Sequence, residues 1–250
     1  MATKLSVLGV GSFGEFMIPH LLPYFHVYAH EPHRDISALS GRYCITAIGF
    51  EQAADADVVV LAPPVQEIEA VARRLAPHLR PGTLVLDVCS VKVEPLRLLA
   101  EILPAHCAIV GTHPLFGPQS GRNGIAGLNI SVCEVRGGRG PCVAAFLRDE
   151  LKLTVIETSP EEHDRQLAYV QGLTHLLARI IVDMDMPAVT QTTATFDNLK
   201  RMVDIVRHDS EQLFRAIENR NPFVEEVRQQ FFRSATRIET RLHAQYRKDV

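Results

Sequence analysis

The sequence lacks a basic excess, a membrane-spanning run and paired cysteines, and each absence narrows the possible functions. The formal net charge is −3 over 250 residues, so no overall positive charge attracts nucleic acid. No apolar run approaches the ~20 residues that span a bilayer, and no signal-peptide pattern opens the chain. The five cysteines form no Cys-x-x-Cys pair, so neither a disulfide framework nor a zinc site is predicted. We therefore expect a cytoplasmic protein that acts on a small molecule, with no nucleic-acid, membrane or metal partner.

Short apolar runs alternate with helical patterns over the first 158 residues. The expected strands are 4–10, 26–30, 58–61, 84–88, 108–110, 129–135 and 154–157, and the expected helices are 13–22, 65–75, 92–103 and 141–151. Strands that alternate with helices of this length form crossover units. The pattern predicts an α/β fold, with a mostly parallel, Rossmann-type sheet in a dinucleotide-binding domain over residues 1–158.

The pattern changes after Ser159-Pro160. Glycine almost disappears, and apolar residues recur at helical spacing, with breaks at Pro187 and at Asn221-Pro222. We expect an all-helical domain of about four helices over residues 159–250. This domain is short for an independent core but carries several large aromatic side chains, so we expect it to form a homodimer; these are Phe214, Phe223, Phe231 and Phe232.

A glycine-rich turn joins the first expected strand and helix. Residues 9–14 read Gly-Val-Gly-Ser-Phe-Gly, the G-x-G-x-x-G spacing of a dinucleotide site. In such a turn the first glycine permits the bend, the second lets the backbone approach the pyrophosphate, and the third lets helix and strand pack closely. The alternative is an ordinary tight turn, but a strand before the motif and a helix after it favour a cofactor site; its expected residues are Gly9, Gly11, Ser12, Phe13 and Gly14.

The second strand ends at an acidic residue that bears on the choice of cofactor. Glu31 lies ~20 residues after the first glycine, where a carboxylate holds the ribose 2′-hydroxyl of NAD. Glu31 favours NAD, whereas His33 and Arg34 leave NADP possible. Ala62 and Pro63, after the third expected strand, should line the same crevice.

Three further segments hold polar residues in apolar surroundings. They are Asp87–Lys92, Gly111–Gly121 and Gln171–His175. The first two directly follow expected strands, and ligands bind at strand carboxyl ends in open α/β sheets. We therefore expect Ser90 and His113 to point into one crevice.

These segments resemble the signatures of the prephenate/arogenate dehydrogenase family. The matching stretches read Asp-Val-Cys-Ser-Val-Lys, Thr-His-Pro-Leu-Phe-Gly-Pro and Gln-Gly-Leu-Thr-His, in that order. The later stretches Phe196–Leu199 and Asp209–Phe214 look like the plant-type arogenate dehydrogenase branch. The resemblance implies oxidative decarboxylation of a cyclohexadienol in tyrosine biosynthesis, with hydride transfer to a nicotinamide cofactor.

The resemblance also implies roles for individual residues. His113 accepts the proton of the substrate hydroxyl, and Ser90 holds that hydroxyl in line. His175 and Gln171, one helical turn apart, reach the substrate carboxylates, and Gln119 lies on a loop above the pocket. Simpler readings make Ser90 a helix cap, His175 a buried helix contact, and His163 and Asp164 part of a helix N-terminus.

Several alternatives stay open at this point. The arginine motif that pairs with the substrate carboxylate in many bacterial members is absent, and Lys200, Arg201 and Arg207 are its candidate replacements. The substrate of the reaction can be an amino-substituted prephenate, and the chain can be a non-catalytic nucleotide sensor or a β-hydroxyacid or imine reductase. Residues 167–171 include no acid to meet the ammonium of arogenate, which favours prephenate, whereas the resemblance to the plant-type branch favours arogenate and a second subunit can supply Asp197, Asp204 or Asp209. We expect activity on both substrates with a small preference for prephenate.

Overall fold

The computed structural model describes residues 3–246 and shows two compact units that divide between His163 and Asp164. The sequence analysis placed this boundary after residue 158, whereas the units divide inside a helix, α6 (Pro160–Leu167). The outer ends of the two expected domains, residues 1–2 and 247–250, lie outside the described residues.

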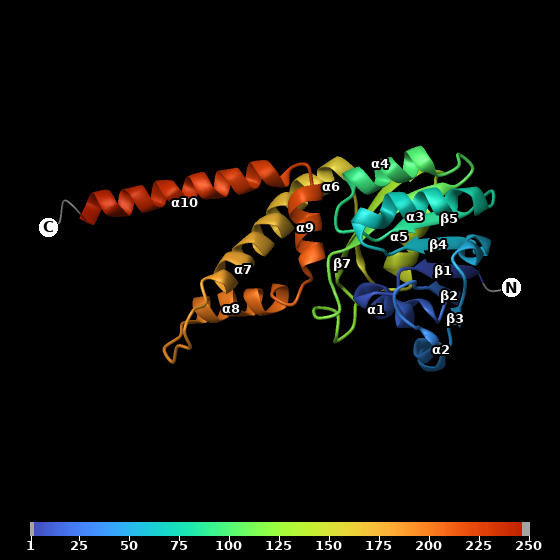
Figure 1. The fold of residues 1–250 in the computed structure, drawn as a ribbon, viewed down its shortest axis with the longest axis horizontal. Coiled ribbons are helices and arrows are strands. Elements are labelled where there is room, and N and C mark those ends of the chain that lie inside the picture. Colours follow the sequence, from blue (N-terminus) through green and yellow to red (C-terminus); the bar gives the residue numbers. More distant parts are fainter. Residues whose placement is uncertain (1–2, 247–250) are drawn as a thin grey trace. The chain divides into compact units, whose positions relative to one another are not determined.

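The first unit is built on one eight-stranded sheet in the order β3-β2-β1-β4-β5-β6-β7-β8 (Figure 1). The strands are β1 (Lys4–Leu8), β2 (His26–His30), β3 (Thr46–Ala47), β4 (Val58–Leu61), β5 (Leu84–Asp87), β6 (Ala108–Pro114), β7 (Asn129–Arg136) and β8 (Thr154–Glu157). All neighbouring strands pair in parallel except β6 and β7, which confirms the mostly parallel Rossmann-type sheet. The order reverses between β1 and β4, and ligands bind above such a reversal in open α/β sheets.

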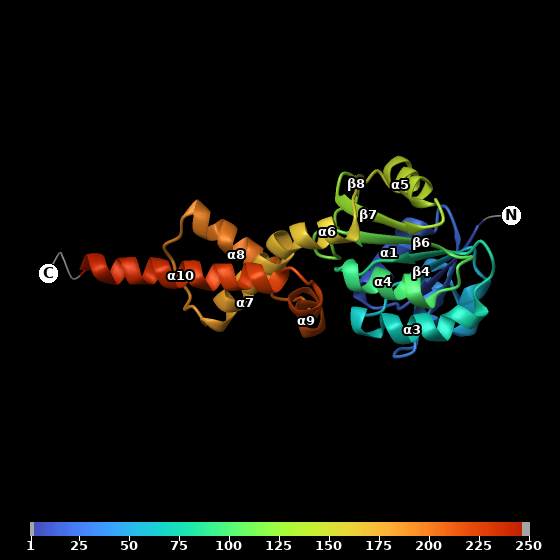
Figure 2. The same cartoon turned by 90° about the horizontal axis from the view of Figure 1, so that it is seen from above.

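Helices cover both faces of this sheet. They are α1 (Ser12–Leu21), α2 (Ser37–Tyr43), α3 (Ile68–Leu75), α4 (Val93–Ile102) and α5 (Gly140–Asp149). Helices α3 and α4 pack on one face, while α5 lies on the other (Figure 2). Along β4, Val59 belongs to the core under α3 and α4, whereas Val60 belongs to the core beneath α1. Alternating side chains therefore fill both cores, as expected of a sheet buried on both faces.

Strand β6 is longer than the sequence predicted. The expected strand stopped at Val110, but antiparallel pairing with β7 continues to Pro114, and His113 pairs with Ser131. His113 therefore lies within the strand rather than directly after it, because β7 supplies backbone partners that a local pattern does not reveal.

The second unit is helical, as predicted. Its helices are the end of α6, a π-helical turn (Ala168–Leu173), α7 (Thr174–Asp183), α8 (Ala194–Val206), α9 (Glu211–Arg220) and α10 (Val224–Tyr246). Pro187 lies between α7 and α8, and Asn221 ends α9, so the two expected breaks are confirmed. Ser210 and Thr193 cap the helices that follow them by accepting backbone N–H groups.

Candidate active site

The glycine turn brings the end of β1 against the end of β4. Gly9 has φ +96°, and a Cβ atom at this position would lie 2.7 Å from the carbonyl carbon of Ala62. The backbone N–H of Ala62 donates to the carbonyl of Leu8 at 2.8 Å. Only glycine fits this close contact, so Ala62 and Pro63 lie beside the glycine turn as the sequence predicted.

The start of α1 is open where a phosphate would approach. Gly11 is the N-cap of α1 and has no side-chain cap, and a Cβ atom there would meet nothing within 4 Å. A Cβ atom on Gly14 would lie 2.2 Å from the Gly9 carbonyl oxygen, so this glycine is required for close packing. The exposed first turn, with Ser12 and the half-buried Phe13, has free N–H groups that suit the pyrophosphate of a dinucleotide.

Glu31 follows β2 and reaches back to the glycine turn. Its Oε2 accepts the N–H of Val10 at 2.8 Å, and its Oε1 accepts the N–H of His33 at 2.9 Å. Each carboxylate oxygen keeps a lone pair for a ribose hydroxyl. The Arg34 guanidinium pairs with Glu15 at 2.6 Å. The residues of this turn therefore fit a nicotinamide dinucleotide.

A buried ion pair stands at the carboxyl end of β5. Asp87 and Lys92 are both fully buried, and the Lys92 ammonium donates to Asp87 Oδ2 and, at 2.8 Å, to the carbonyl of Thr112. Asp87 Oδ1 also accepts the N–H of Cys89 at 2.8 Å, and the Thr112 hydroxyl donates to the Asp87 carbonyl. Buried charges require this degree of pairing, and the network fixes the end of β5 to β6 beside His113.

His113 is buried, with 3% of its surface exposed. Its Nδ1 lies 2.9 Å from Nε2 of His163, while its Nε2 has no partner among the residues that the structure describes. Burial lowers the pKa of His113 well below its usual range, and the nearby charges of His163 and Lys92 lower it further. The imidazole is therefore neutral near pH 7, as a general base must be.

Ser90 and Gln119 are placed on loops near the ends of β5 and β6. Ser90 is half-buried and Gln119 is exposed. Helix α4 begins with Lys92 as its N-cap and without a side-chain cap, so the alternative reading of Ser90 as a cap is wrong. Within residues 3–246 neither side chain forms a hydrogen bond, and the structure does not join Ser90 to His113 directly. Cys89 is buried, as expected of a small hydrophobic residue.

The helical unit holds a second group of the expected residues. His175 is buried, and its Nδ1 lies 2.9 Å from the carbonyl oxygen of Gln171, while its Nε2 lies 3.1 Å from Asp209 Oδ2. Both ring nitrogens thus face acceptors of their own unit. Val170 lies in the π-helical turn before His175 and is 63% exposed, so the helical spacing of apolar residues in the sequence does not bury this one. One π turn shifts the register of every later side chain.

None of the three candidate cations for the substrate carboxylate is buried. Lys200, Arg201 and Arg207 are all exposed. Arg201 donates to Asn198 at 2.7 Å, and Arg207 pairs with Asp204 at 3.4 Å. The contacts of Arg201 and Arg207 are thus local pairs on α8 and at its end.

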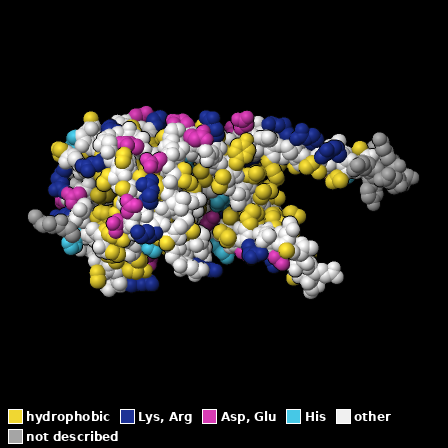
Figure 3. All heavy atoms as spheres, turned by 180° about the vertical axis from the view of Figure 1, so that it is seen from behind, with side chains coloured by type: hydrophobic (Ala, Val, Ile, Leu, Met, Phe, Trp, Pro, Cys, Tyr) yellow, Lys and Arg dark blue, Asp and Glu magenta, His cyan; other side chains and the backbone are white. Residues whose placement is uncertain are grey.

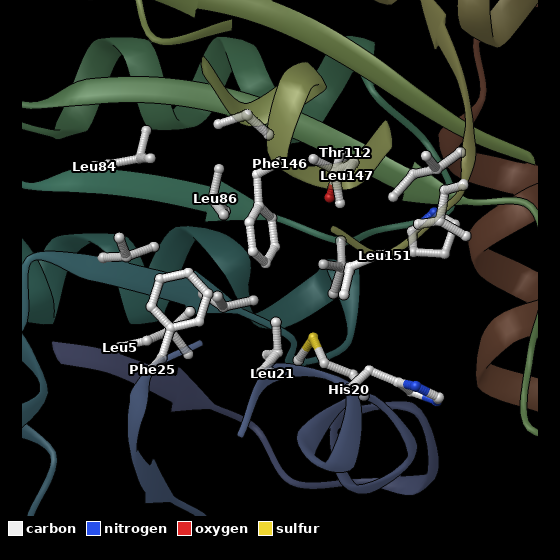
Figure 4. A pocket seen from close by; sticks show the side chains of 18 of the residues that line it. Leu5, His20, Leu21, Phe25, Leu84, Leu86, Thr112, Phe146, Leu147 and Leu151 are labelled. Carbon is white, nitrogen blue, oxygen red and sulfur yellow. The ribbon is translucent and has the colours of Figure 1, made fainter. Parts of the chain in front are cut away.

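An apolar cavity of about 530 Å³ lies between α1, α5 and the sheet. Figure 4 shows Phe146 and Leu147 of α5 on one side and Leu21 of α1 on another. Thr112 contributes to its lining, but Ser90, His113 and Gln119 do not. Side chains alternate along β6, so Thr112 faces this cavity while His113 points to the opposite face of the sheet.

Comparison with known proteins identifies the family. Residues 29–127 match the model of the prephenate dehydrogenase nucleotide-binding domain, and residues 159–250 match that of the prephenate dehydrogenase dimerization domain. Arogenate dehydrogenase 2 of Arabidopsis thaliana, a chloroplastic protein, is 31% identical over 100% of this chain and 74% of its own length. The chain belongs to the prephenate/arogenate dehydrogenase family.

Further relatives and solved structures agree with this membership. Arogenate dehydrogenase 1 of Arabidopsis thaliana is 28% identical over 99% of the chain, which covers 41% of that relative. Prephenate dehydrogenase of A. aeolicus has the same fold, with a TM-score of 0.79 at 20% identity over 100% of this chain and 93% of that one. This family member is therefore a dehydrogenase with a nucleotide-binding domain and a helical domain.

Sequence reasoning missed two buried polar residues of this family member. Lys92 was treated as the start of a helix and His163 as part of a helix N-terminus, yet both are at most 2% exposed. The sequence contained an indication of the role of Lys92, because a buried aspartate such as Asp87 needs a partner of opposite charge and Lys92 follows it by five residues. No local pattern could show that His163 contacts His113, which lies 50 residues earlier.

Proposed function

We propose that this chain oxidatively decarboxylates arogenate to tyrosine and prephenate to 4-hydroxyphenylpyruvate. The observation that carries the proposal is His113, a buried and neutral imidazole at the end of β6 whose Nε2 has no partner among the described residues. It lies in a chain of the family whose relatives are arogenate and prephenate dehydrogenases. The alternative of a non-catalytic sensor has no use for such a group.

The proposed reaction needs one proton acceptor from the protein. A nicotinamide dinucleotide, which the glycine turn and Glu31 would hold, would supply the acceptor for the hydride of the hydroxyl-bearing carbon. His113 Nε2 takes the proton of that hydroxyl, and Ser90 orients the same oxygen. The bond from the ring to its carboxylate breaks, its electron pair moves through the ring to the oxygen, and carbon dioxide leaves as the ring becomes aromatic. His113 then returns the proton to that oxygen, which gives the phenol. Orientation and proton transfer are thus the tasks of these side chains.

An acid beside His175 changes the expected substrate preference. The sequence argument for prephenate rested on the absence of an acid near Gln171, but Asp209 Oδ2 lies 3.1 Å from His175 Nε2. A carboxylate can meet the ammonium of arogenate, which prephenate lacks. We therefore propose that His175 and Gln171 hold Asp209 in place for that ammonium, and that arogenate is preferred.

We propose NAD rather than NADP as the cofactor. Both oxygens of Glu31 bind backbone N–H groups of the turn, which fixes a negative charge where a 2′-phosphate would lie. Arg34 is paired with Glu15 and is thereby partly neutralised. A higher kcat/KM with NADP than with NAD would contradict this choice.

The test is the purified chain with each substrate and each cofactor, followed by reduced nicotinamide absorbance. The expected result is turnover of both substrates, with the larger kcat/KM on arogenate and a loss of that preference in Asp209→Asn. Glu211→Gln is the matched control, because Glu211 begins the next helix and is exposed. No turnover of either substrate would refute the function, and an unchanged preference in Asp209→Asn would refute the role of Asp209.

We also propose that the chain forms a homodimer and works in the cytoplasm. The match of residues 159–250 to a dimerization domain supports the first proposal. The second rests on the free cysteines alone, and two plant relatives are chloroplastic. No described helix is long and apolar enough to cross a membrane.

A further inference from the structure

We propose that His163 is a positioning residue that holds His113 in the tautomer able to accept the substrate proton. This inference rests on the proposed function and adds to it a residue that the family signatures of the sequence analysis left without a role. His163 lies in α6, and its side chain reaches the end of β6 inside the first unit.

The contact between the two rings is direct and shielded from water. Nδ1 of His113 lies 2.9 Å from Nε2 of His163, and the ring planes meet at 64°. His113 is 3% exposed and His163 is 2% exposed. A hydrogen bond in such a buried place is not readily replaced by one to water.

A bond between two ring nitrogens holds one proton, so it selects a tautomer. If His113 donates from Nδ1, its Nε2 is unprotonated and can accept a proton. If His163 donates instead, His113 carries its proton on Nε2 and cannot act as a base. The proposed reaction requires the first arrangement, in which His163 Nε2 is the acceptor.

The surroundings also favour a neutral His113. The charged groups facing His113 are the Lys92 ammonium, which donates to the neighbouring Thr112 carbonyl, and its partner Asp87. Burial and Lys92 disfavour a positive charge on the His113 ring. A neutral His113 has one ring proton, and in the proposed arrangement that proton lies on Nδ1 and is donated to His163.

Two substitutions of His163 separate hydrogen bonding from simple packing. His163→Gln keeps an acceptor near the position of Nε2, whereas His163→Leu fills similar space without one. We expect kcat to fall about 10²-fold in His163→Leu with KM little changed, and most of this loss to be recovered in His163→Gln. His106→Gln is the control, because the His106 Nε2 likewise makes one contact, with the Leu79 carbonyl oxygen at 3.1 Å, before the start of β6 and thus at the opposite end of this strand from His113.

Nitrogen NMR of the His113 ring supplies a readout that does not need turnover. In the wild type and in His163→Gln we expect a proton on Nδ1 and none on Nε2, and in His163→Leu a mixture of tautomers. Thermal unfolding and cofactor binding should be alike in all variants. The inference is overturned if His163→Leu keeps kcat within threefold of the wild type, if His163→Gln is no better than His163→Leu, or if wild-type His113 carries its proton on Nε2. Absence of wild-type turnover would instead refute the proposed function and leave the NMR result to decide on the pair.

Discussion

At the scale of single residues, the proposed chemistry depends on polar groups that are buried and already paired. His113, Lys92 and Asp87 are each at most 3% exposed, and each has its charge or its ring fixed by a neighbour. Removing Lys92 or Asp87 would leave the other charge buried without its partner, whereas replacing the neutral His113 leaves no buried charge. Substitution of His113 should therefore affect turnover before it affects cofactor binding.

His113→Asn should lower turnover by about 10²–10⁴-fold, because the amide cannot take the hydroxyl proton. Cofactor affinity should stay nearly unchanged, since the glycine turn and Glu31 are untouched. Steady-state kinetics and cofactor titration check this. A variant that retains more than about a tenth of wild-type turnover would contradict the role of His113.

The lowered pKa of His113 predicts the acid side of the pH profile. Burial and the charges of His163 and Lys92 disfavour the protonated ring, so the base stays active as the pH falls through the ordinary histidine value of about 6.5. The value of kcat/KM should decline only below that pH, when the lowered pKa is reached. A profile that loses half its activity at or above pH 6.5 would show that another group controls the reaction.

Glu218 offers a test of stability in the helical unit. It is 6% exposed, and its Oε1 is the buried side-chain atom without a hydrogen-bond partner among the described residues, while Oε2 meets Arg228 at 2.9 Å. Burial raises the pKa of Glu218, so its contribution to stability is present below the unfolded value of about 4.5 and is lost as the pH rises through the raised value.

Glu218→Leu should therefore gain stability relative to the wild type as the pH rises. At pH 8 we expect its free energy of unfolding to be equal or higher by about 1–2 kcal/mol, because Arg228 is partly exposed and can be solvated. Denaturant unfolding at pH 5 and pH 8 measures the difference. Glu226→Leu, at an exposed position of α10, is the control, and a loss above about 2 kcal/mol in Glu218→Leu would contradict this account.

At the scale of elements, the two faces of the sheet differ in packing. The face under α3 and α4 is closely packed at Gly111, which allows Leu96 of α4 to approach β6 so closely that a Cβ atom would lie 2.6 Å away. The face under α1 and α5 contains the apolar cavity (Figure 4). Equal increases in side-chain volume should thus change the free energy of unfolding by different amounts on the two faces.

Val59→Leu and Val60→Leu provide a matched pair on β4. Val59 is fully buried in the core under α3 and α4, and an extra methylene there should lower the free energy of unfolding by about 1–3 kcal/mol. Val60 lines the cavity, and the added methylene should fill empty space there, so that the free energy of unfolding changes little or rises slightly. Thermal unfolding compares them, and an equal loss in both would show that the cavity does not accommodate a larger side chain.

At the scale of the whole molecule, α10 points to assembly. It spans Val224–Tyr246, but from Ala235 to Ala244 every residue is exposed, including Ile238 and Leu242 at 50% and 61%. Figure 3 shows hydrophobic side chains gathered on this helical unit. A helix end without packing partners is marginal in water, so a second copy is the expected source of contacts.

The double substitution Ile238→Glu and Leu242→Glu should weaken the homodimer. Charges placed in an apolar interface lose hydration without gaining partners. Light scattering at micromolar concentration should give a dimer for the wild type and a smaller mass for the variant. Arg237→Ser, at an exposed position next to Ile238 that is already polar, should remain a dimer, and a monomeric wild type would refute the assembly.

Much of the fold and part of the site follow from the sequence alone. The glycine spacing, the acid at the end of β2 and the alternation of strands and helices predicted the nucleotide-binding domain, because each depends on residues close together in the chain. The polar segments after β5 and around His113 likewise predicted candidate site residues, and their roles in the reaction stay predictions. Local patterns also predicted the breaks at Pro187 and Asn221.

Only the tertiary structure decided which distant groups meet. The pairing of β7 with β6 extended the strand through His113, the π turn moved Val170 to the surface, and folding brought His163 to His113 and Asp209 to His175. These contacts join residues 34 and 50 positions apart, so no local periodicity encodes them. They arise because buried polar groups must find partners wherever the packed backbone places them.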